Sequence, residues 1–524
     1  ESDRIPSPAG SSSRLAGEPR VQAQVLNDVR RAGYADVVVL LRDGLAPSSD
    51  LEAFETAADA VQDAVLSAVP SEQFEVHTKY DALPILAGRV TAAGLAALER
   101  HPLVAAVEAD EVMKPIAYTH PGTSVSGRVD PGQALAEAVP VIEADYVHEH
   151  YGITGEGVTV AVLDTGIDND HPDFADKILD QYCYASSRSC PPTDIVEGPS
   201  AEDEYGHGTA VSGIILSNGT VSHVGVAPGA KLAAVRVFKD SGGASTSDII
   251  KGLDWVLRKQ HPLGIRVVNM SLGAGASLGN NCDDQQQATK EAFGRLVARQ
   301  VIIFVATGNN GLPSQVSSPA CISNSTAVGA TYDVESPTGG RWCPQQKDVT
   351  PLTIACFTNR GRAMDLLAPG LFIVTSGMGG GVTEPGAGTS YASPMAAGVA
   401  ALMLQADPDL RPSEIERIMQ RTGTDVKHLE NDDIFSLVNA RRAVEEVLPE
   451  TPMPSETPEP SATPTREATN EPSDTPTPEP GTPATSPTAA ERTPTSTRTA
   501  APTRTRTVND DYDLFLPALK NLAR

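Results

Sequence analysis

The sequence predicts an α/β protein in which helices flank a parallel sheet, with a small α+β domain before it and a disordered Pro/Thr-rich tail after it. Apolar strand-like runs alternate with helix-like stretches in the middle of the chain, as in a parallel sheet covered on both faces. These runs are 158–164, 231–237, 265–271, 301–306 and 364–368. The 524-residue length suggests more than one domain, and 40% apolar residues are enough for a core.

The chain before the predicted sheet divides into two parts. Residues 1–34 are expected to be disordered, and they contain no apolar stretch of the kind found in a secretion signal. Because the chain starts with Glu, a signal peptide removed before this numbering begins would explain both observations. Residues 35–116 follow the order β-α-β-β-α-β, which is the open-faced sandwich of a ferredoxin-like domain.

Three phrases within residues 117–448 each supply one residue of a nucleophilic site. Asp164 lies in AVLDTGID, His207 in YGHGTAVSG and Ser390 in GAGTSYASPMAAG. A hydroxyl becomes a nucleophile at neutral pH only if a base takes its proton and a third group holds that base in one tautomer. Singly, these residues have ordinary interpretations as a capping carboxylate, a core histidine and a loop serine. Their order, Asp then His then Ser, is one of the few in which this geometry recurs.

A fourth phrase, VIIFVATGNNG, places Asn309 after a buried strand-like run. Open α/β sheets bind ligands at the carboxyl ends of their strands. Acyl transfer builds negative charge on the former carbonyl oxygen, and a side-chain amide directed at it stabilises that charge. Asn309 is therefore the candidate donor, together with the backbone N–H of Ser390; the alternative is a turn residue that tolerates positive φ. His207 and Ser390 each begin a helix-like stretch, and we expect Pro394 in the first turn of the second.

These phrases resemble the motifs of the subtilisin-like serine peptidases. The resemblance extends over residues 150–425 and includes HPDF (171–174), GVAPGAKL (225–232) and NMSLG (269–273). It implies a subtilisin-like parallel sheet flanked by helices, and hydrolysis of protein or peptide substrates. The related sedolisin peptidases have a Glu base and an Asp at the oxyanion position, so this chain differs from them at both places.

The resemblance assigns a role to each candidate catalytic residue. Asp164 orients His207, which acts as general base and then as general acid. Ser390 attacks the peptide carbonyl, Asn309 stabilises the tetrahedral oxyanion, and water then hydrolyses the acyl-enzyme.

In the same family two segments line the substrate groove as edge backbone and pair with an extended peptide. They correspond here to Ser271, Leu272 and Gly273, and to Ala306, Thr307 and Gly308. The alternative is that these small residues only pack. None of the residues around the expected first specificity pocket (Ala306, Gly308 and Asn310) is charged, so we expect a broad endopeptidase that accepts apolar residues before the cut.

A structural calcium ion is also implied by the family, whereas no organic cofactor is expected. Asp173 matches a position that ligates calcium in many members, helped by the loop NGTVSHV (218–224). Calcium takes six to eight oxygen ligands, and Thr220 replaces a usual Asn ligand in this loop. The alternative is that Asp173 only caps a turn.

The family further implies that residues 35–116 are an inhibitory propeptide, which assists folding and blocks the groove with its own C-terminal end. Autocleavage is then expected within about residues 114–121. The enzyme is expected to be a monomeric zymogen, inhibited by this part of its own chain. An unrelated accessory domain is the alternative.

Six cysteines fall inside the predicted catalytic region, which fits disulfides formed in an oxidising compartment. Nearness in the chain favours Cys183–Cys190 and Cys343–Cys356, which leaves Cys282–Cys321; reduced, buried thiols are the alternative.

The net charge of −27 argues against nucleic acid as a partner. No run of 18 apolar residues exists, so no membrane span is expected. An extracellular or cell-surface location fits all of these features.

Two segments follow the predicted catalytic region. Residues 449–507 are rich in Thr, Pro, Ser and Glu and are expected to form an extended linker or stalk. Residues 508–524 form a short apolar tail, interpreted either as a sorting or attachment tag or as a frayed end.

Three functions compete at this point. The first is a secreted serine endopeptidase, and the second is a pseudoprotease or surface binding module with the same fold. Presence of Asp164, His207, Ser390 and Asn309 together favours the first, because a binding module needs none of them. The third is a non-peptidase serine hydrolase, which would more usually carry G-x-S-x-G than the G-T-S-Y-A found here.

Overall fold

The computed structural model describes residues 20–116, 135–192, 195–239, 242–274, 277–427 and 433–449. All of them belong to one compact unit, Glu1–Thr451. The first 19 residues, the predicted stalk beyond residue 449 and the predicted C-terminal tail lie outside the described residues.

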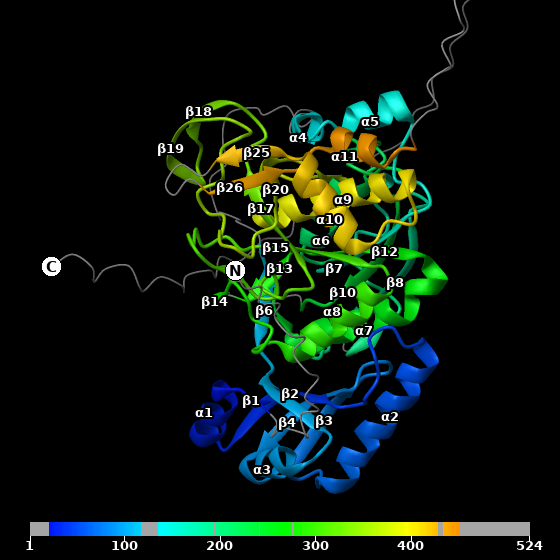
Figure 1. The fold of residues 1–524 in the computed structure, drawn as a ribbon, viewed down its shortest axis with the longest axis vertical. Helices are drawn as coiled ribbons and strands as arrows, with labels where there is room; N and C mark the ends of the chain where they lie inside the picture. Colours follow the sequence, from blue (N-terminus) through cyan, green and yellow to red (C-terminus); the bar gives the residue numbers. More distant parts are fainter. Residues whose placement is uncertain are drawn as a thin grey trace, which may run out of the picture. The chain divides into compact units, whose positions relative to one another are not determined.

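A ten-stranded sheet forms the centre of the larger part of the molecule (Figure 1). Its order is β25-β26-β20-β17-β15-β12-β7-β10-β8-β9, and neighbours run parallel except at the two edges, where β25–β26 and β8–β9 are antiparallel. Its strands are β7 (Thr159–Asp164), β8 (Ile178–Tyr184), β9 (Glu197–Gly198), β10 (Lys231–Arg236), β12 (Ile265–Met270), β15 (Ile302–Ala306), β17 (Thr326–Thr331), β20 (Leu366–Pro369), β25 (Thr424–Lys427) and β26 (Ile434–Leu437). The predicted α/β class is confirmed, and the five predicted runs are β7, β10, β12, β15 and β20.

Helices cover both faces of this sheet. Because successive residues of a strand point to opposite faces, Val160 and Val162 of β7 pack on one side, and Ala161 and Leu163 pack on the other. The helices on the first side are α4 (Leu135–Val141), α5 (Ala144–Tyr151), α6 (His207–Leu216), α9 (Thr389–Ala406), α10 (Pro412–Thr422) and α11 (Ala440–Val447). The helices on the second side are α7 (Thr246–Leu263) and α8 (Gln287–Ala298).

The central helix α9 is buried on all sides from Thr389 to Leu404, as expected for a helix that is apolar all round. Pro394 is its sixth residue, so the expectation that it lies in the first turn is wrong. Proline has no N–H to donate to the carbonyl four residues earlier, which belongs to Ser390. That carbonyl instead accepts a hydrogen bond from Ser271 Oγ at 2.8 Å, and this contact replaces the missing backbone bond.

The smaller part of the molecule is built on a five-stranded sheet of order β1-β5-β2-β4-β3. Its elements are β1 (Arg20–Val21), α1 (Ala23–Ala32), β2 (Tyr34–Leu41), α2 (Leu51–Ala68), β3 (Phe74–Lys79), β4 (Ile85–Thr91), α3 (Ala92–Arg100) and β5 (Val104–Ala109). From β2 to β5 this is the predicted β-α-β-β-α-β order. The expectation of disorder is wrong for residues 20–34, because Val25 and Val29 lie one turn apart on α1 and are buried in the small domain's core.

One face of the small sheet carries its own helices, and the other face packs on α7 and α8 of the larger part (Figure 1). Val38 and Leu40 of β2 share an apolar cluster with residues of α7 and α8. Tyr80 donates from its hydroxyl to Ser247 O at 2.9 Å, and Ala82 N donates to Asp254 Oδ1 at 2.8 Å. The interface therefore combines apolar packing with directed hydrogen bonds.

The remaining elements are short. They are the 3-10 turn η1 (Pro172–Phe174), and the strands β6 (Val112–Pro115), β11 (Ala244–Ser245), β13 (Leu272–Ala274), β14 (Ser277–Gly279), β16 (Val316–Ser317), β18 (Ser336–Gly339), β19 (Cys343–Val349), β21 (Leu371–Ile373), β22 (Ser376–Gly377), β23 (Gly381–Val382) and β24 (Gly386–Ala387). Three disulfides join Cys183–Cys190, Cys282–Cys321 and Cys343–Cys356, which confirms the predicted pairing. Among the described residues, no helix is both long enough and apolar enough to cross a membrane.

Candidate active site

The first contact of the candidate site joins the end of a strand to the start of a helix. Asp164 is the last residue of β7, and His207 is the first residue of α6. The His207 Nδ1–H donates to Asp164 Oδ1 at 2.7 Å, and both side chains are buried. Because the carboxylate is an acceptor, the hydrogen of His207 is held on Nδ1, and Nε2 carries the lone pair that a general base needs.

Ser390 lies in the first turn of α9 and is buried. Neither Ser390 Oγ nor His207 Nε2 has a hydrogen-bond partner among the described residues. The structure therefore records the Asp–His contact of the predicted triad but no Ser–His hydrogen bond. The ring of Tyr391 lies edge-on to the His207 ring, with centroids 6.3 Å apart. Burial, followed by the charge of Asp164, raises the pKa of Tyr391 to about 12, so this neighbour is neutral at physiological pH.

Three groups from distant parts of the sequence converge beside Gly388. A Cβ atom at this glycine would lie 2.8 Å from Ile116 O, 2.9 Å from Asn309 Nδ2 and 3.0 Å from Ser390 Oγ. Asn309 Nδ2 donates to Ile116 O at 2.9 Å. A peptide carbonyl therefore lies beside both the predicted nucleophile and the predicted oxyanion donor, in space that only glycine leaves open.

The amide of Asn309 is oriented by Thr389. Both the backbone N–H and the hydroxyl of Thr389 donate to Asn309 Oδ1, each at 2.9 Å. With the oxygen end fixed in this way, the NH₂ end points at the carbonyl of Ile116. Thr389 stands in the sequence GTS beside Ser390, where the sequence alone indicates no role for it.

The carbonyl of Ile116 follows an extended strand, β6, that lies between two strands of the larger part. β6 pairs antiparallel with β13, with Gly273 opposite Lys114, and antiparallel with β11, with Ala244 opposite Met113. Ile116 N also donates to Ser271 O at 3.1 Å. Ser271–Gly273 therefore pairs with an extended segment of the same chain, in the manner of strand addition, and its contact with substrate stays a prediction.

The side chain of Ile116 lies against Gly273. A Cβ atom at Gly273 would come 2.6 Å from Ile116 Cδ1 and 3.0 Å from Ser318 O, so any side chain at this position would fill the space that Ile116 occupies. Ile116 is itself largely buried. The space beside Gly273 therefore holds an apolar side chain, that of the residue immediately before the candidate scissile bond.

No hydrogen bond joins the second predicted groove segment, Ala306, Thr307 and Gly308, to β6 in the described part of the chain. Thr307 N donates to Val328 O, and Ser317 N donates to Thr307 O. Gly308 N donates to Thr389 Oγ1 at 3.1 Å. These bonds tie the segment to the sheet and to the first turn of α9, so its contact with substrate stays a prediction.

Asp173 does not fit the predicted calcium site. Its carboxylate accepts hydrogen bonds from Val221 N, Ser222 N, Ser222 Oγ and Ser376 Oγ, at 2.7–3.0 Å. Burial raises the pKa of Asp173, but these hydrogen bonds outweigh it and hold the pKa below its usual value. Donor hydrogens point at oxygens that a cation would need, and the described residues contain no group of three His, Cys, Asp or Glu that could hold a metal.

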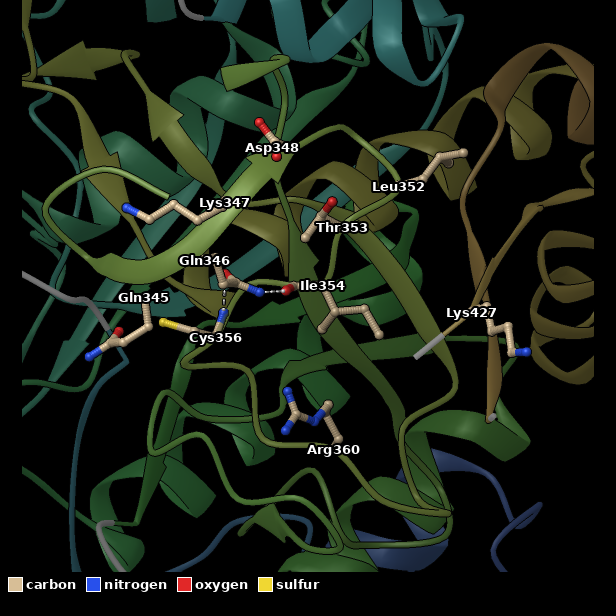
Figure 2. Close-up of a pocket in the computed structure, with 10 residues that line it drawn as sticks. All are labelled: Gln345, Gln346, Lys347, Asp348, Leu352, Thr353, Ile354, Cys356, Arg360 and Lys427. Carbon is tan, nitrogen blue, oxygen red and sulfur yellow. Dashed lines mark hydrogen bonds between the residues drawn. The ribbon is translucent and has the colours of Figure 1, made fainter. Parts of the chain in front are cut away.

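A pocket of about 550 Å³ lies outside the candidate site, beside the β18–β19 hairpin (Figure 2). Figure 2 shows Gln346 among the residues that line it, with its side chain bonded to the backbone of Ile354 and Cys356. None of the predicted site residues lines this pocket. At the candidate site itself, the segment Val112–Ile116 pairs with β11 and β13 and bonds to Ser271 O.

Comparisons with known proteins agree with this geometry. The Subtilase family model matches residues 155–437. The chain is 30% identical to the M-protease of Shouchella clausii (strain KSM-K16), over 72% of this chain and 84% of that protein. It is 34% identical to an extracellular serine proteinase of Thermus sp. (strain Rt41A), over 61% of this chain and 66% of that protein. It is 32% identical to Subtilisin Savinase of Lederbergia lenta, over 59% of this chain and 99% of that protein.

Proposed function

The chain belongs to the subtilase family and is a subtilisin-like serine peptidase, and on that premise we propose that it is a secreted endopeptidase made as a zymogen. In this proposal Asp164, His207 and Ser390 are the catalytic triad, and Asn309 is the oxyanion donor. The observation that carries the proposal is the carbonyl of Ile116, which lies beside Ser390 Oγ and accepts a hydrogen bond from Asn309.

The proposed chemistry follows from the groups around that carbonyl. His207 Nε2 takes the proton of Ser390 as Oγ attacks the carbonyl carbon, and Asp164 stabilises the imidazolium that forms. The negative charge that develops on oxygen is stabilised by Asn309 Nδ2 and by the N–H of Ser390, one of the first four N–H groups of α9, which have no intrahelical partner. His207 then protonates the leaving amine, and water, activated by the same imidazole, hydrolyses the acyl-enzyme.

We propose that residues up to Ile116 are the propeptide and that autocleavage occurs at the bond after Ile116, within the range expected from the sequence. Two features support this. β6 already has the antiparallel register of a bound substrate, and the small domain that carries it packs on α7 and α8. After cleavage, the same contacts hold the new C-terminus in the groove, so the propeptide remains an inhibitor until it is removed.

The proposed specificity follows from the pocket beside Gly273. An apolar side chain before the scissile bond fits against this glycine, as Ile116 does. Ser271, Leu272 and Gly273 are proposed to form the substrate edge, and Ala306, Thr307 and Gly308 the opposite wall. The enzyme then cleaves proteins and peptides broadly, after apolar residues.

We propose that the enzyme works outside the cell. Three disulfides fit an oxidising compartment, and one relative is named an extracellular serine proteinase.

Casein hydrolysis tests this function directly. The processed enzyme is expected to degrade casein, and a serine-directed fluorophosphonate is expected to abolish the activity. The variant Ser390→Ala, made as the control, is expected to fold and to show no hydrolysis. A wild-type chain that folds but neither hydrolyses casein nor reacts with the fluorophosphonate would instead indicate a pseudoprotease.

A further inference from the structure

Asn359 is fully buried and lies 50 residues from Asn309 in the sequence, just after the Cys343–Cys356 disulfide. Every polar atom of its side chain is directed at the segment that carries Asn309 or at the strand beside it. No sequence motif indicates a role for Asn359, because its hydrogen-bond partners are distant in the chain.

The backbone of Asn359 holds the residue before Asn309. Asn359 N donates to Gly308 O at 2.9 Å. The next residue adds a second link, since Arg360 N donates to Leu312 O at 2.7 Å. These two bonds fix the positions at which the 308–312 segment begins and ends.

The side chain of Asn359 holds the residues after Asn309. Its Oδ1 accepts from Asn310 N at 2.9 Å and from Leu312 N at 3.1 Å. Its Nδ2 donates to Ser317 Oγ at 3.1 Å and to Asn310 Oδ1 at 3.4 Å. Asn359 is therefore hydrogen-bonded to the backbone on both sides of Asn309, and Ser317 in turn accepts a hydrogen bond from the Asn359 side chain.

The hydrogen bonds from Asn359 to the 308–312 segment determine where the amide of Asn309 lies. The Asn309 side chain is short, so its Nδ2 reaches the Ile116 carbonyl at 2.9 Å only if the backbone of residue 309 is held. Thr389 sets the orientation of the amide but bonds only to its oxygen end. An oxyanion donor contributes most when its position is fixed before the reaction, because no reorganisation is then needed.

We propose that Asn359 is a positioning residue for the oxyanion hole, acting through Asn309 without contacting substrate. This inference rests on the proposed function, since it assigns a role to Asn359 within the same reaction. Asn359→Ala is expected to free the 308–312 segment, so that Asn309 loses its fixed distance to the developing oxyanion.

A kinetic comparison of wild type with Asn359→Ala gives the first test. On a peptide anilide with an apolar residue before the cut, Asn359→Ala is expected to lower kcat about 10- to 100-fold and to change KM by less than about 3-fold. An unchanged kcat with a raised KM would overturn the proposal, because it would mean that Asn359 only shapes a binding pocket.

A double-mutant cycle with Asn309→Ala gives the decisive test. The quantity measured is the first-order rate constant of self-cleavage of the refolded full chain. Intact mass spectrometry follows this reaction, and it can be used for slow variants as well. If Asn359 acts through Asn309, Asn359→Ala lowers this rate about 10- to 100-fold in the wild-type background and less than about 3-fold in the Asn309→Ala background. Equal losses in both backgrounds would overturn the proposal.

Two further variants keep the test independent of folding defects. Asn439→Ala removes another buried asparagine, which accepts from Arg442 N at the start of α11 and donates to Glu143; it is expected to lower Tm without lowering kcat. Ser317→Ala removes one of the two acceptors of Asn359 Nδ2, and we expect a loss of rate of roughly 2- to 5-fold that disappears in the Asn309→Ala background. If Asn359→Ala does not fold, the same cycle with Ser317→Ala decides, and a loss of rate that persists in both backgrounds overturns the proposal.

A wild-type chain that hydrolyses no peptide would contradict the proposed function, whereas an active wild type with unaffected variants would contradict only the role of Asn359.

Discussion

Both ends of the Asn309 amide are hydrogen-bonded: its Oδ1 accepts from Thr389, and its Nδ2 donates to the carbonyl of Ile116. This arrangement matters because an oxyanion donor stabilises charge that exists only in the transition state. Asn309→Ala should therefore lower kcat on an apolar peptide anilide about 10²- to 10³-fold, the range found when the equivalent donor is removed from a subtilisin, with KM nearly unchanged. A variant with normal kcat and raised KM would show that Asn309 binds substrate without stabilising the oxyanion.

Asp173 illustrates how a residue can match a motif and have a different local role. Its carboxylate accepts hydrogen bonds from Val221, Ser222 and Ser376, and these bonds anchor the loop after α6. Asp173→Ala leaves these donors unpaired in a buried place and should lower the free energy of unfolding by roughly 3 kcal/mol. The loss should be the same in calcium and in EDTA, as measured by urea unfolding. A loss seen in calcium but absent in EDTA would restore the calcium interpretation.

The sequence predicted individual residues where a short phrase carries the chemistry, as for Asp164 and His207. It could not predict Asn359 or the placement of Ile116 O, because those contacts join segments separated by tens to hundreds of residues. It also left the role of Asp173 open, since the two serines that donate to its carboxylate lie 49 and 203 residues away.

At the scale of elements, two helices of the larger part receive carboxylates from the small domain at their first turns. Ser247 of α7 donates from N and Oγ to Asp110, at 2.9 and 2.6 Å. Gln287 N and Ala288 N of α8 donate to Glu108, at 2.5 and 3.3 Å. The first N–H groups of a helix have no intrahelical partner, so each carboxylate satisfies donors that would otherwise be buried unpaired.

These two carboxylates make the stability of the unprocessed chain depend on pH. Burial raises the pKa of Glu108 to about 7 and of Asp110 to about 6, against the opposing hydrogen bonds. A carboxyl whose pKa is higher in the folded state contributes stability at low pH, and that contribution is lost as the pH rises through 6 to 7. In a Ser390→Ala background, the doubly neutral variant Glu108→Gln/Asp110→Asn should gain stability relative to its parent between pH 5 and pH 8. Thermal unfolding at four pH values measures this, and a difference that is constant or reversed would contradict it.

The sequence predicted elements well where one residue class dominates. β7, β12 and β15 are apolar throughout most of their length and were all expected, whereas β17 (TAVGAT) consists of small residues and lacks an apolar run. β8 was missed because Asp180 and Gln181 interrupt its apolar pattern. Helix α1 was missed because its buried residues are few and its remaining surface is polar.

At the scale of the whole molecule, the small domain and the larger part form one continuous arrangement around β6. The small sheet packs on α7 and α8, its carboxylates bind their first turns, and β6 extends from it into the groove. The domain that we propose to be the propeptide therefore presents one particular bond, the one after Ile116, to Ser390. This coupling could not be read from the sequence, which gave only a range of 114–121 for the cut.

For the full chain, we propose that Ser390 cleaves the bond after Ile116. Intact mass spectrometry of the refolded full chain over time tests this cleavage, with Ser390→Ala refolded in parallel. A fragment ending at Ile116 is expected in the wild type, appearing at a rate independent of protein concentration, and no such fragment is expected in Ser390→Ala. A fragment ending elsewhere, or the same fragment formed equally fast in Ser390→Ala, would contradict it.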